Sequence, residues 1–558
     1  MRLDWFWVED FKNLKDVTID FDEKHWVTVV IGWNGTGKSN VLEALATLFR
    51  DLIMIHEFKG SRKPTFRYKL VYECQGNIVA IDADPKRKRN SYKFSVRDKN
   101  DTKQRLLGFE LLHDNCDKAF NRGDTISLTQ FIKYQNKYLP RNVFGYYSGY
   151  AGRMEDIFQP YLEKYDEQLR SGKDPGFKRL FFALPIHSQF VLLAFVLKHE
   201  KMVKEFLEKL LFLDPVDGIE SVLFVLKKPG WANSKRQGGD KRFWSAKGVV
   251  QDFLARLYDI ALAPVRITRE TRITLWNKSK LEFLYLFVKD MEALRQLVGK
   301  REPRSLFRDI ESTFVSEMIE EIRIKIRLRD DKGKVTFREL SEGEQQLLTV
   351  LGLLCFTADD QSLFLLDEPD THLNPRWSAD YLEYLKSFVG SNKDGEENSH
   401  ILLTTHNPLA IAELVKEQVQ ILKRSESDLE TTVHTPAEDP QGMGYSGIVT
   451  SDMFGLDAAL DKVTFELLEE KRSILASEKQ TAVQVQRLDQ INEQLEGLGF
   501  RYETRDPVYT EYLRARYEYE TSQISDSSPT KLTPEERKEK AKKLVDRALK
   551  KSSEEVQA

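Results

Sequence analysis

Cysteine is scarce in this chain of 558 residues, which holds three: Cys74, Cys116 and Cys355. Their wide spacing excludes the paired-cysteine pattern of a zinc knuckle, and an odd, sparse set does not build a disulfide framework. Long hydrophobic runs are also missing. The longest, residues 190–197, is far shorter than the roughly 20 apolar residues of a membrane-spanning helix. We therefore expect a cytoplasmic protein that does not enter a membrane.

An excess of charge of one sign is missing as well. The chain has 85 basic and 88 acidic residues, a net charge of −3, so any binding of nucleic acid would depend on a local patch. One candidate patch lies between two predicted strands, and the other spans residues 227–247, where basic side chains alternate with aromatic ones. Such residues hold phosphates and stack on bases, but a solvated hairpin tip and a mobile surface hairpin are the alternatives. The members of the two patches that carry the argument are Lys86, Arg87, Lys88 and Arg89, and Lys227, Trp231, Phe243, Trp244 and Lys247.

A glycine-rich loop follows a predicted buried strand at residues 26–31 and precedes a predicted helix at residues 40–50. Its glycines allow backbone N–H groups to converge on an anion, and the start of the helix adds free N–H groups and partial positive charge. In this pattern the lysine reaches the β- and γ-phosphates and the serine coordinates Mg²⁺. The order of strand, loop and helix therefore predicts a phosphate site and argues against a chance glycine turn. The loop and the first helical position are Gly32, Trp33, Asn34, Gly35, Thr36, Gly37, Lys38, Ser39 and Asn40.

A second group of polar residues lies some 300 positions later. The sequence Leu-Ser-Glu-Gly-Glu-Gln-Gln at residues 340–346 opens a predicted helix, with Ser341 as its N-cap. A predicted buried strand at residues 363–366 then ends in Asp367 and Glu368. Asp367 would hold Mg²⁺ through water, and Glu368 would act as general base on an attacking water. His406 ends another predicted strand, residues 401–406, and would contact the γ-phosphate or that water.

The remaining segments have simpler patterns. Alternating apolar residues predict strands at residues 65–72, 78–83, 91–96 and 142–148, and a further strand at 419–424. Residues 153–330 are mostly helical in period, with a break at Pro185, and residues 461–495 predict a helical hairpin. A helix from residue 506, a Ser/Pro-rich linker at 522–530 and a capped tail helix from residue 533 complete the chain.

These motifs, in this order, resemble those of the ABC-type ATPases, in the branch of SMC, RecF and OLD-like proteins. Residues 32–39 match Walker A, residues 340–346 the signature motif and residues 363–368 Walker B. Asp370 looks like the D-loop residue and His406 like the switch histidine. The run Asp-Glu-Pro-Asp-Thr-His-Leu-Asn-Pro at residues 367–375 is further similar to the ATPase subunits of Septu-type anti-phage defence systems, including retron-associated ones.

The resemblance implies an α/β fold: a discontinuous ABC-type P-loop ATPase domain with an inserted helical lobe and a helical C-terminal extension. The boundaries that we expect are an ATPase lobe with Walker A at residues 1–150 and a helical insertion with the basic hairpin at 151–330. The second ATPase lobe, with the signature, Walker B and the switch histidine, would follow at 331–455. A helical region at 456–520 and a linker with a charged tail helix at 521–558 would end the chain.

The resemblance also implies ATP and Mg²⁺ as cofactors and a homodimer or higher oligomer formed through the ATP sites. ATP would lie between Walker A of one copy and Ser341 and Gly343 of the other, with Asp370 in the loop that faces the second subunit. The implied partners are an HNH nuclease and, in some systems, a reverse transcriptase with a structured RNA–DNA. The chain would then be a regulatory ATPase that controls the nuclease through nucleotide-dependent dimerisation.

Two points depart from the family patterns. OLD nucleases carry a metal-binding Asp-x-Asp pair after the ATPase, but residues from 419 onward have no such pair and one histidine, His434. We therefore expect that the chain is not itself a nuclease. An ABC ATPase also has a glutamine near the nucleotide, and Gln130, Gln135 and Gln159 are equal candidates. The alternative function is a DNA-repair or DNA-binding ATPase of RecF or SMC type, which would act through the two basic patches.

Overall fold

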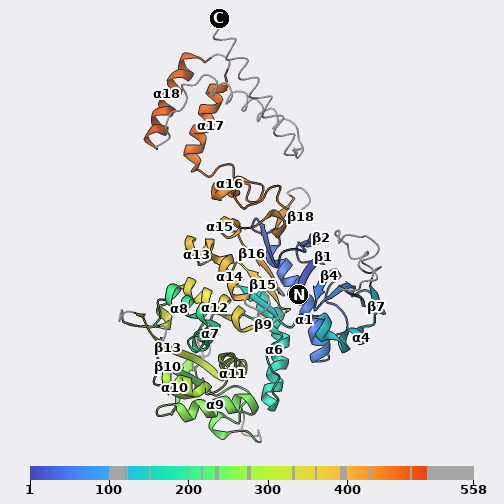
Figure 1. Ribbon diagram of the computed structural model, residues 1–558, viewed down its shortest axis with the longest axis vertical. Coiled ribbons are helices and arrows are strands. Elements are labelled where there is room, and N and C mark those ends of the chain that lie inside the picture. Colours follow the sequence, from blue (N-terminus) through green and yellow to red (C-terminus); the bar gives the residue numbers. More distant parts are fainter. Residues whose placement is uncertain are drawn as a thin grey trace. The chain divides into compact units, whose positions relative to one another are not determined.

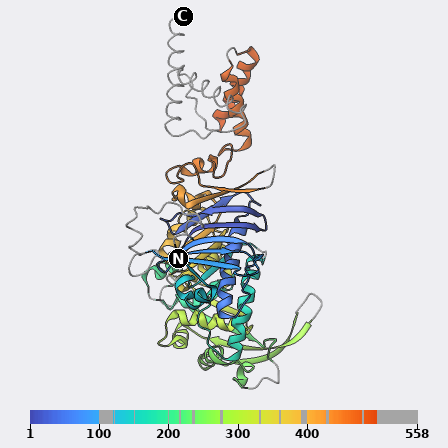
Figure 2. The same cartoon turned by 90° about the vertical axis from the view of Figure 1, so that its right-hand side faces the viewer.

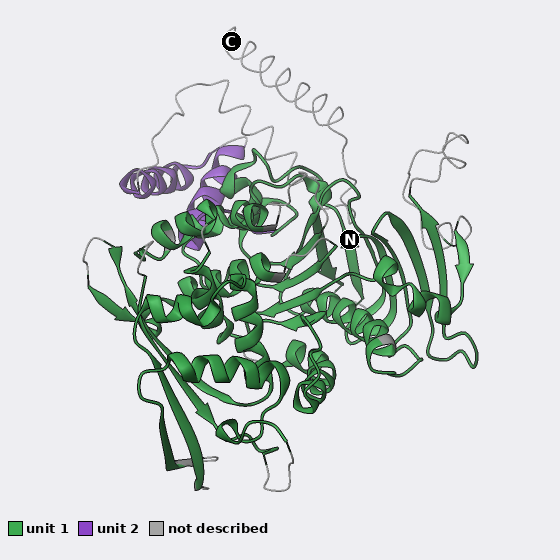
Figure 3. Cartoon of the chain, turned by 60° about the horizontal axis from the view of Figure 1, so that its bottom comes forward, with its two compact units in different colours: residues 1–454 green, residues 455–558 purple. Residues whose placement is uncertain are grey.

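The computed structural model describes residues 1–99, 120, 123–149, 152–198, 200–214, 218–232, 238–272, 278–329, 333–357, 361–389, 399–425, 430–477 and 480–498. The chain divides into two compact units, residues 1–454 and residues 455–558 (Figure 3). Among the described helices, none combines the length and the hydrophobicity that crossing a membrane requires.

Seven strands form the central sheet of the first unit, in the order β18-β17-β3-β16-β15-β8-β9 (Figure 1). Neighbouring strands are parallel except for β17 and β18. The strands at the centre of the sheet are short apolar runs buried on both faces, which is typical of a parallel sheet covered by helices. The bounds are β3 Val27–Gly32, β8 Val143–Tyr147, β9 Leu180–Phe182, β15 Leu363–Asp367, β16 His400–Thr404, β17 Val419–Arg424 and β18 Thr431–His434.

The sequence predicted five of these strands, at residues 26–31, 142–148, 363–366, 401–406 and 419–424. All five are confirmed, with ends that differ by no more than two residues. The predicted helix after the glycine loop is α1 (Lys38–Glu57), which is longer than expected. It packs against β3, β8, β15 and β16, so the loop that precedes it is held at one edge of the central sheet.

Further helices surround this core. The helix α6 (Arg153–Ser171) packs against α1 and β9, and α12 (Glu342–Thr357) packs against α7 (His187–Phe195) and α14 (Tyr381–Val389). The other helices of the first unit outside the insertion's own sheet are α4 Leu128–Lys133, α5 Gln135–Tyr138, α8 Lys201–Leu210, α13 Pro375–Ala379, α15 Pro408–Ile411 and α16 Gly444–Thr450.

An antiparallel sheet of six strands forms the N-terminal part of the unit, and Figure 2 shows its strands lying side by side in blue. The strands predicted at residues 65–72, 78–83 and 91–96 belong to it. Residues 86–89 lie in the turn between two of its strands, where the Arg87 guanidinium donates to both carboxylate oxygens of Asp82 at 2.8 and 2.6 Å. This patch is therefore a hairpin tip. The strands, in sheet order, are β2 Leu14–Asp20, β1 Arg2–Phe11, β4 Tyr68–Cys74, β5 Asn77–Ala83, β6 Tyr92–Asp98 and β7 Asp124–Ile126.

The expectation of a helical insertion at residues 151–330 needs a correction, because much of it is an antiparallel sheet of five strands in the order β11-β12-β10-β13-β14. Short apolar runs fit a buried helix and a buried strand equally well, and the aromatic and β-branched residues of these segments favour the strand. The strands are β10 Ile219–Lys227, β11 Val265–Arg272, β12 Lys278–Val288, β13 Ile319–Arg327 and β14 Lys334–Thr336; the helices α9 Gly248–Ile260, α10 Met291–Val298 and α11 Pro303–Val315 pack against this sheet.

The expectation that the aromatic residues of the basic stretch at 227–247 stack on bases also needs a correction. Phe243 and Trp244 are 0% and 8% exposed, and the indole N–H of Trp231 donates to the Ser316 carbonyl at 2.9 Å. These rings belong to the core of the insertion, so they do not form a platform for bases. Residues 233–237 of this stretch lie outside the described residues.

The second unit contains the predicted helical hairpin, formed by α17 (Lys462–Ala476) and α18 (Ala482–Gly497). Ile474, Ile491 and Leu495 make its small apolar core. The Arg487 guanidinium adds a two-point contact with the Glu470 carboxylate, at 2.7 Å to each oxygen. The predicted helix from residue 506, the linker and the tail helix lie outside the described residues.

A buried ionic triad connects three segments of the first unit. The Glu311 carboxylate of α11 contacts the Lys178 ammonium and, at 2.7 Å, Nε2 of His187 on α7. The Leu184 N–H donates to Nδ1 of His187 at 2.8 Å, so Nε2 is the nitrogen that donates to Glu311. Burial raises the pKa of Glu311, but His187 and Lys178 outweigh it and bring the pKa down to about 2. The Glu311 carboxylate is therefore charged, and its ionised form is stabilised by both His187 and Lys178.

Replacing Lys178 by methionine should destabilise the first unit by roughly 3–5 kcal/mol, because Glu311 loses a cation while it stays buried. The matched control is Lys164→Met on α6, which removes an exposed ammonium 2.9 Å from Glu167 and should change the stability by less than about 0.5 kcal/mol. Urea unfolding followed by circular dichroism measures both. Equal effects of the two changes would contradict the structural importance of the triad.

Candidate functional site

The phosphate loop opens at the carboxyl edge of the central sheet, where three parallel strands end together. Thr404 of β16 pairs with Val30 of β3 and with Asp367 of β15. A pocket of about 250 Å³ lies at this edge. It brings the loop and the later acidic residues together, as the sequence predicted. The residues that line it are Asn13, Asn34, Gly35, Gly37, Lys38, Ser39, Asn40, Tyr147, Ser148, Gly149, Arg153, Asp367, Glu368 and His406.

Gly37, directly before α1, is confined by its neighbours and by its backbone. Its φ is 107°, in the left-handed region, and a Cβ there would lie 2.8 Å from both Asn13 Oδ1 and Leu14 Cδ2. Asn13 in turn donates to the Gly35 carbonyl at 2.9 Å and accepts from the Asn40 amide at 2.5 Å. The turn between β1 and β2 therefore fixes the shape of the phosphate loop, and only glycine fits at position 37.

The side chain of Lys38 folds back along the loop. Its ammonium donates to the carbonyls of Gly32 and Trp33 at 3.0 and 3.3 Å. Burial lowers the pKa of Lys38, while the carboxylates of Glu368 and Asp367 act in the opposite direction. The positive charge thus faces both carboxylates across the pocket, where the phosphates of a nucleotide would lie.

Asp367 ends β15 as a buried carboxyl group. Burial raises its pKa, whereas hydrogen bonds from the Thr404 and Ser39 hydroxyls and the charge of Lys38 oppose that rise. Oxygen ligands of this kind are those that Mg²⁺ prefers, with its remaining positions filled by water and phosphate oxygens. The donor set of Ser39 and Asp367 therefore fits Mg²⁺.

Glu368 has a different environment from its neighbour. Its φ of 50° places a non-glycine residue in the left-handed region, a strained conformation that is typical of functional sites, and its N–H donates to the Thr404 carbonyl at 3.0 Å. The half-exposed carboxylate lies 3.2 Å from Nε2 of His406. The hydrogen bond from His406 lowers the pKa of Glu368, and the charge of Lys38 contributes to the same effect. Glu368 is thus an ionised carboxylate that is accessible from the pocket.

Four of the predicted binding residues do not line this pocket. Ser341 is exposed at the start of α12, where its hydroxyl accepts from the Glu344 N–H at 3.3 Å and donates to the Glu344 carboxylate at 2.7 Å. Gly343 follows on the same helix, and a Cβ there would lie 2.6 Å from the His372 carbonyl. Thr36 donates to the Trp33 carbonyl at 2.8 Å and so stabilises the loop from within.

The fourth of these residues, Asp370, is buried. Its carboxylate accepts from the Thr405 hydroxyl at 3.0 and 2.9 Å, and that hydroxyl accepts from the Asn407 N–H at 2.9 Å. Burial raises the pKa of Asp370, and the hydrogen bond from the Thr405 hydroxyl counteracts the rise. In one copy of the chain, Asp370 therefore holds the turn that carries His406, instead of facing outward.

Five residues that line the pocket were not among the predicted site residues: Asn13, Tyr147, Ser148, Gly149 and Arg153. Tyr147 ends β8 and Ser148 and Gly149 follow it, whereas Asn13 lies in the turn between β1 and β2 and Arg153 begins α6. The Arg153 guanidinium lies 3.7 Å from the buried Glu43 carboxylate of α1 and donates to the Tyr147 hydroxyl at 3.3 Å. Glu43 also pairs with Lys12. A local pattern does not reveal Asn13 or Arg153, because both reach the site through tertiary packing.

None of the three candidate glutamines lines the pocket. Gln130 closes a capping box with Ser127 at the start of α4. Gln135 accepts from the Arg179 guanidinium at 2.8 Å, and Gln159 is exposed on α6. The segment that follows β8 instead presents Tyr147, Ser148 and Gly149 to the pocket, so the expectation of a glutamine from this set is wrong.

Two family models match the chain, on two separate segments. Residues 1–151 match a model described as "AAA ATPase domain". Residues 279–412 match one described as "AAA domain, putative AbiEii toxin, Type IV TA system". The first match contains the phosphate loop, and the second contains residues 340–346, Asp367, Glu368 and His406.

Two relatives with assigned names match shorter segments. The chain is 26% identical over 157 residues to "Septu protein PtuA" of Bacillus mycoides (strain KBAB4), covering 26% of this chain and 21% of that protein. It is 23% identical over 151 residues to "Retron Vc95 probable ATPase" of Vibrio cholerae serotype O1 biovar El Tor, covering 24% of this chain and 27% of that protein. The matched segment is thus about a quarter of each relative or less.

Solved structures are also similar to part of the chain. A complex of the SmcHead with the C-winged helix domain of ScpA matches 78% of this chain and 98% of its own, at 11% identity and a TM-score of 0.31. The recombination mediator protein RecF matches 78% of this chain and 97% of its own, at 14% identity and a TM-score of 0.27.

The phosphate loop, the strand that ends in Asp367 and Glu368 and the strand that leads to His406 meet in one pocket, and both halves of this pocket fall within ATPase family models. Over these two segments the chain is similar to ATPase domains, and over about a quarter of its length it is similar to a Septu protein and a retron ATPase.

Proposed function

We propose that the chain hydrolyses ATP and that its nucleotide state controls a partner protein. One observation carries the first part: a basic loop, two carboxylates and a histidine share one pocket, with Glu368 and His406 3.2 Å apart. The pKa values of the two acids shift in opposite directions, because burial raises the pKa of Asp367 while His406 lowers that of Glu368. Such a difference suits one acid to a metal ion and the other to proton transfer.

In this proposal the loop N–H groups and Lys38 bind the β- and γ-phosphates. Ser39 and Asp367 hold Mg²⁺, which neutralises charge on the phosphates. Glu368 takes a proton from the attacking water, and His406 orients that water or the γ-phosphate and keeps Glu368 ionised. Arg153 and Asn13, which line the same pocket, keep α1 and the loop in the binding geometry.

A second copy of the chain would complete the site. Ser341 is exposed, and the hydrogen bonds recorded for its side chain stay within its own capping box. Gly343 follows in the same turn. We propose that these two residues contact the phosphates bound by the Walker A loop of another copy, so that ATP bridges a homodimer and its loss loosens the pair. Bound nucleotide would stabilise the dimer in proportion to the logarithm of its concentration over its dissociation constant.

The relatives indicate the biological setting. One is named as a protein of a Septu system and the other as an ATPase of a retron. We propose that this chain is the ATPase of an anti-phage defence system of the same kind. A partner HNH nuclease would supply nucleic acid cleavage, and a reverse transcriptase with its RNA–DNA would join it in a retron.

The alternative of a DNA-binding ATPase has less support from the described residues. Arg87 is committed to Asp82, and Phe243 and Trp244 are buried. The two basic patches that would contact DNA therefore have fewer free groups than the sequence indicated.

Replacing Glu368 by glutamine should slow ATP hydrolysis by about 10²–10⁴-fold, because the general base is lost, while ATP binding is retained and the dimer persists. Phosphate release measures the rate, and mass photometry with ATP measures the dimer. Glu163→Gln, at an exposed position on α6, is the control and should hydrolyse ATP normally. Hydrolysis by Glu368→Gln at the wild-type rate would refute the role of Glu368.

Replacing His406 by alanine should move the acidic limb of the pH–rate profile to higher pH. His406 lowers the pKa of Glu368, so its removal raises that pKa, and the base then becomes protonated, and inactive, at a higher pH. The profile of kcat/KM against pH measures the shift. His372→Ala, which alters a histidine outside the phosphate pocket, should leave the limb in place. A limb that stays unmoved in His406→Ala would show that another group sets it.

A further inference from the structure

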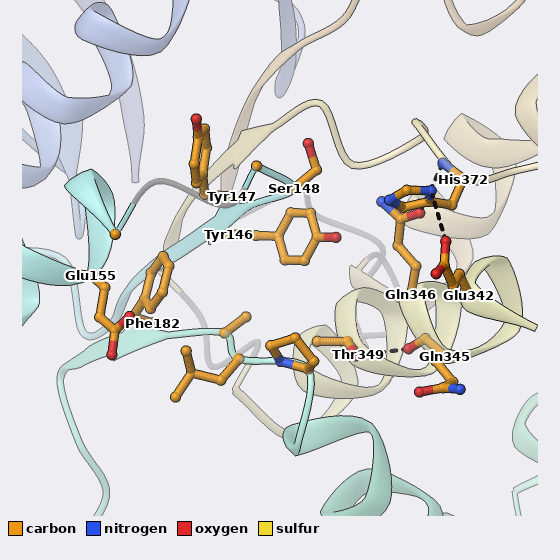
Figure 4. A pocket seen from close by; sticks show the side chains of 15 residues that line it. Tyr146, Tyr147, Ser148, Glu155, Phe182, Glu342, Gln345, Gln346, Thr349 and His372 are labelled. Carbon is orange, nitrogen blue, oxygen red and sulfur yellow. Dashed lines mark hydrogen bonds and ion pairs between the residues drawn. The ribbon is translucent and has the colours of Figure 1, made fainter. Parts of the chain in front are cut away.

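A second pocket, shown in Figure 4, has a volume of about 390 Å³ and adjoins the phosphate pocket. Tyr147, Ser148 and Gly149 line both pockets. Its volume falls in the range of ligand sites, roughly 300–1,000 Å³. The pocket lies between the end of β8, the start of α6, the turn from β9 to α7 and the first two turns of α12. None of the roles assigned above uses this space.

Much of the pocket wall is apolar. Figure 4 shows Tyr146 and Phe182 across the pocket from the start of α12. Ala183, Leu184 and Pro185 line it as well, from the turn that leads to α7. A wall of this composition binds an apolar side chain.

One buried amide in the pocket is incompletely satisfied. Gln346 is 5% exposed, and its Oε1 accepts from the His372 N–H at 3.2 Å. Its Nε2 is buried without a well-formed hydrogen bond among the described residues, and the neighbouring polar group is the Tyr146 hydroxyl, whose pKa burial raises and the Gln346 side chain lowers. Because Nε2 carries two N–H groups, this amide can still donate to a ligand that brings an oxygen acceptor, such as a peptide carbonyl.

The charges at the rim have one sign. The carboxylates of Glu155 and Glu342 line the pocket, and no lysine or arginine is among its lining residues. Glu342 lies 3.4 Å from Nδ1 of His372, and no ion pair is recorded for Glu155 in the described part of the chain. This arrangement disfavours an anionic ligand, including a nucleotide, and favours a cationic one.

We infer that this pocket binds a segment of a partner protein in which a bulky apolar side chain is flanked by arginine or lysine. The apolar side chain packs between Phe182 and Leu184, a carbonyl of the segment accepts from Gln346, and the basic side chain crosses the aromatic wall to reach Glu155. Long basic side chains can cover apolar surface in this way while the charged end meets a carboxylate.

The position of the pocket would let this partner sense the nucleotide, an inference that rests on the proposed function. Tyr147 pairs with Asp367 in the sheet. The Ser148 N–H donates to the Asp367 carbonyl at 3.2 Å, and the Thr371 hydroxyl lies 3.5 Å from that of Ser148. A displacement of the 147–149 segment by bound nucleotide would therefore change the wall that the partner contacts.

The test is selection of peptides by the full chain. A phage library of random 12-residue peptides is panned on the wild-type chain, after counter-selection on Ala183→Trp, in which the indole fills the pocket. Enriched peptides should share an apolar residue beside arginine or lysine. In fluorescence polarisation, Glu155→Lys should weaken their binding at least 10-fold, whereas Glu163→Lys, further along α6 at an exposed position, should not. Leu184→Trp serves as a second blocked variant if thermal melting shows that Ala183→Trp does not fold.

Three results would overturn the inference. The first is a selection that yields no peptide preferring the wild type, the second is enrichment of acidic peptides, and the third is enrichment of peptides that bind Glu155→Lys and Glu163→Lys equally. Loss of self-association in the folded blocked variant, by mass photometry, would also overturn it by identifying a second copy as the occupant. Peptide binding is measured without nucleotide and hydrolysis separately, so absent hydrolysis with intact peptide binding refutes the proposed function alone.

Discussion

Parallel pairing of β3, β16 and β15 is the constraint on which the rest of this structure depends. The pairing of Val30 with Thr404 and of Thr404 with Asp367 places the phosphate loop, Glu368 and the turn with His406 at one edge of the sheet. A slip by one residue would reverse the side chains of a whole strand and would turn Asp367 away from Ser39. The three strands have few polar side chains that could specify their register, namely Thr28, His400, Thr404 and Asp367. The register therefore follows mainly from burial on both faces and from the helices packed on them. The geometry of the site is thus a consequence of core packing.

The electrostatics of the site follow from that geometry. Two adjacent carboxylates face one buried ammonium, and each carboxylate has its own means of support: hydroxyl donors for Asp367 and an imidazole for Glu368. A third acid, Asp370, stabilises the turn after β16 through its hydrogen bonds with Thr405. Some of these supporting groups line the pocket, whereas Thr404 and Thr405 do not. Changes to the two threonines would therefore alter the position or charge of the carboxylates from outside the pocket.

Local patterns in the sequence were sufficient for the central strands, the phosphate loop and the two acids, because each depends on a short run of residues that can be read by itself. Glycines before a lysine and a serine, and an apolar strand that ends in two acids, are signals of this kind. Asn13 and Arg153 have no such signal, since their neighbours in space are far away in the chain. The five-stranded sheet of the insertion was missed because its apolar runs suit either a helix or a strand. The aromatic residues near position 243 were misread because the sequence does not reveal whether a ring beside a basic residue points inward or outward.

The long interval between paired strands also concerns how the protein is made. β3 is followed by its two neighbours in the sheet only after about 370 further residues. At roughly 5–20 residues per second, a ribosome needs about 20 to 75 seconds to supply them. During that time a strand with three valines and one isoleucine among its six residues has no lateral partner and is an aggregation hazard. The N-terminal antiparallel sheet, in contrast, can pair most of its strands as they emerge. Synthesis of this chain therefore requires either protection of β3 by that early sheet and α1 or the help of a chaperone until residues 363–424 are available.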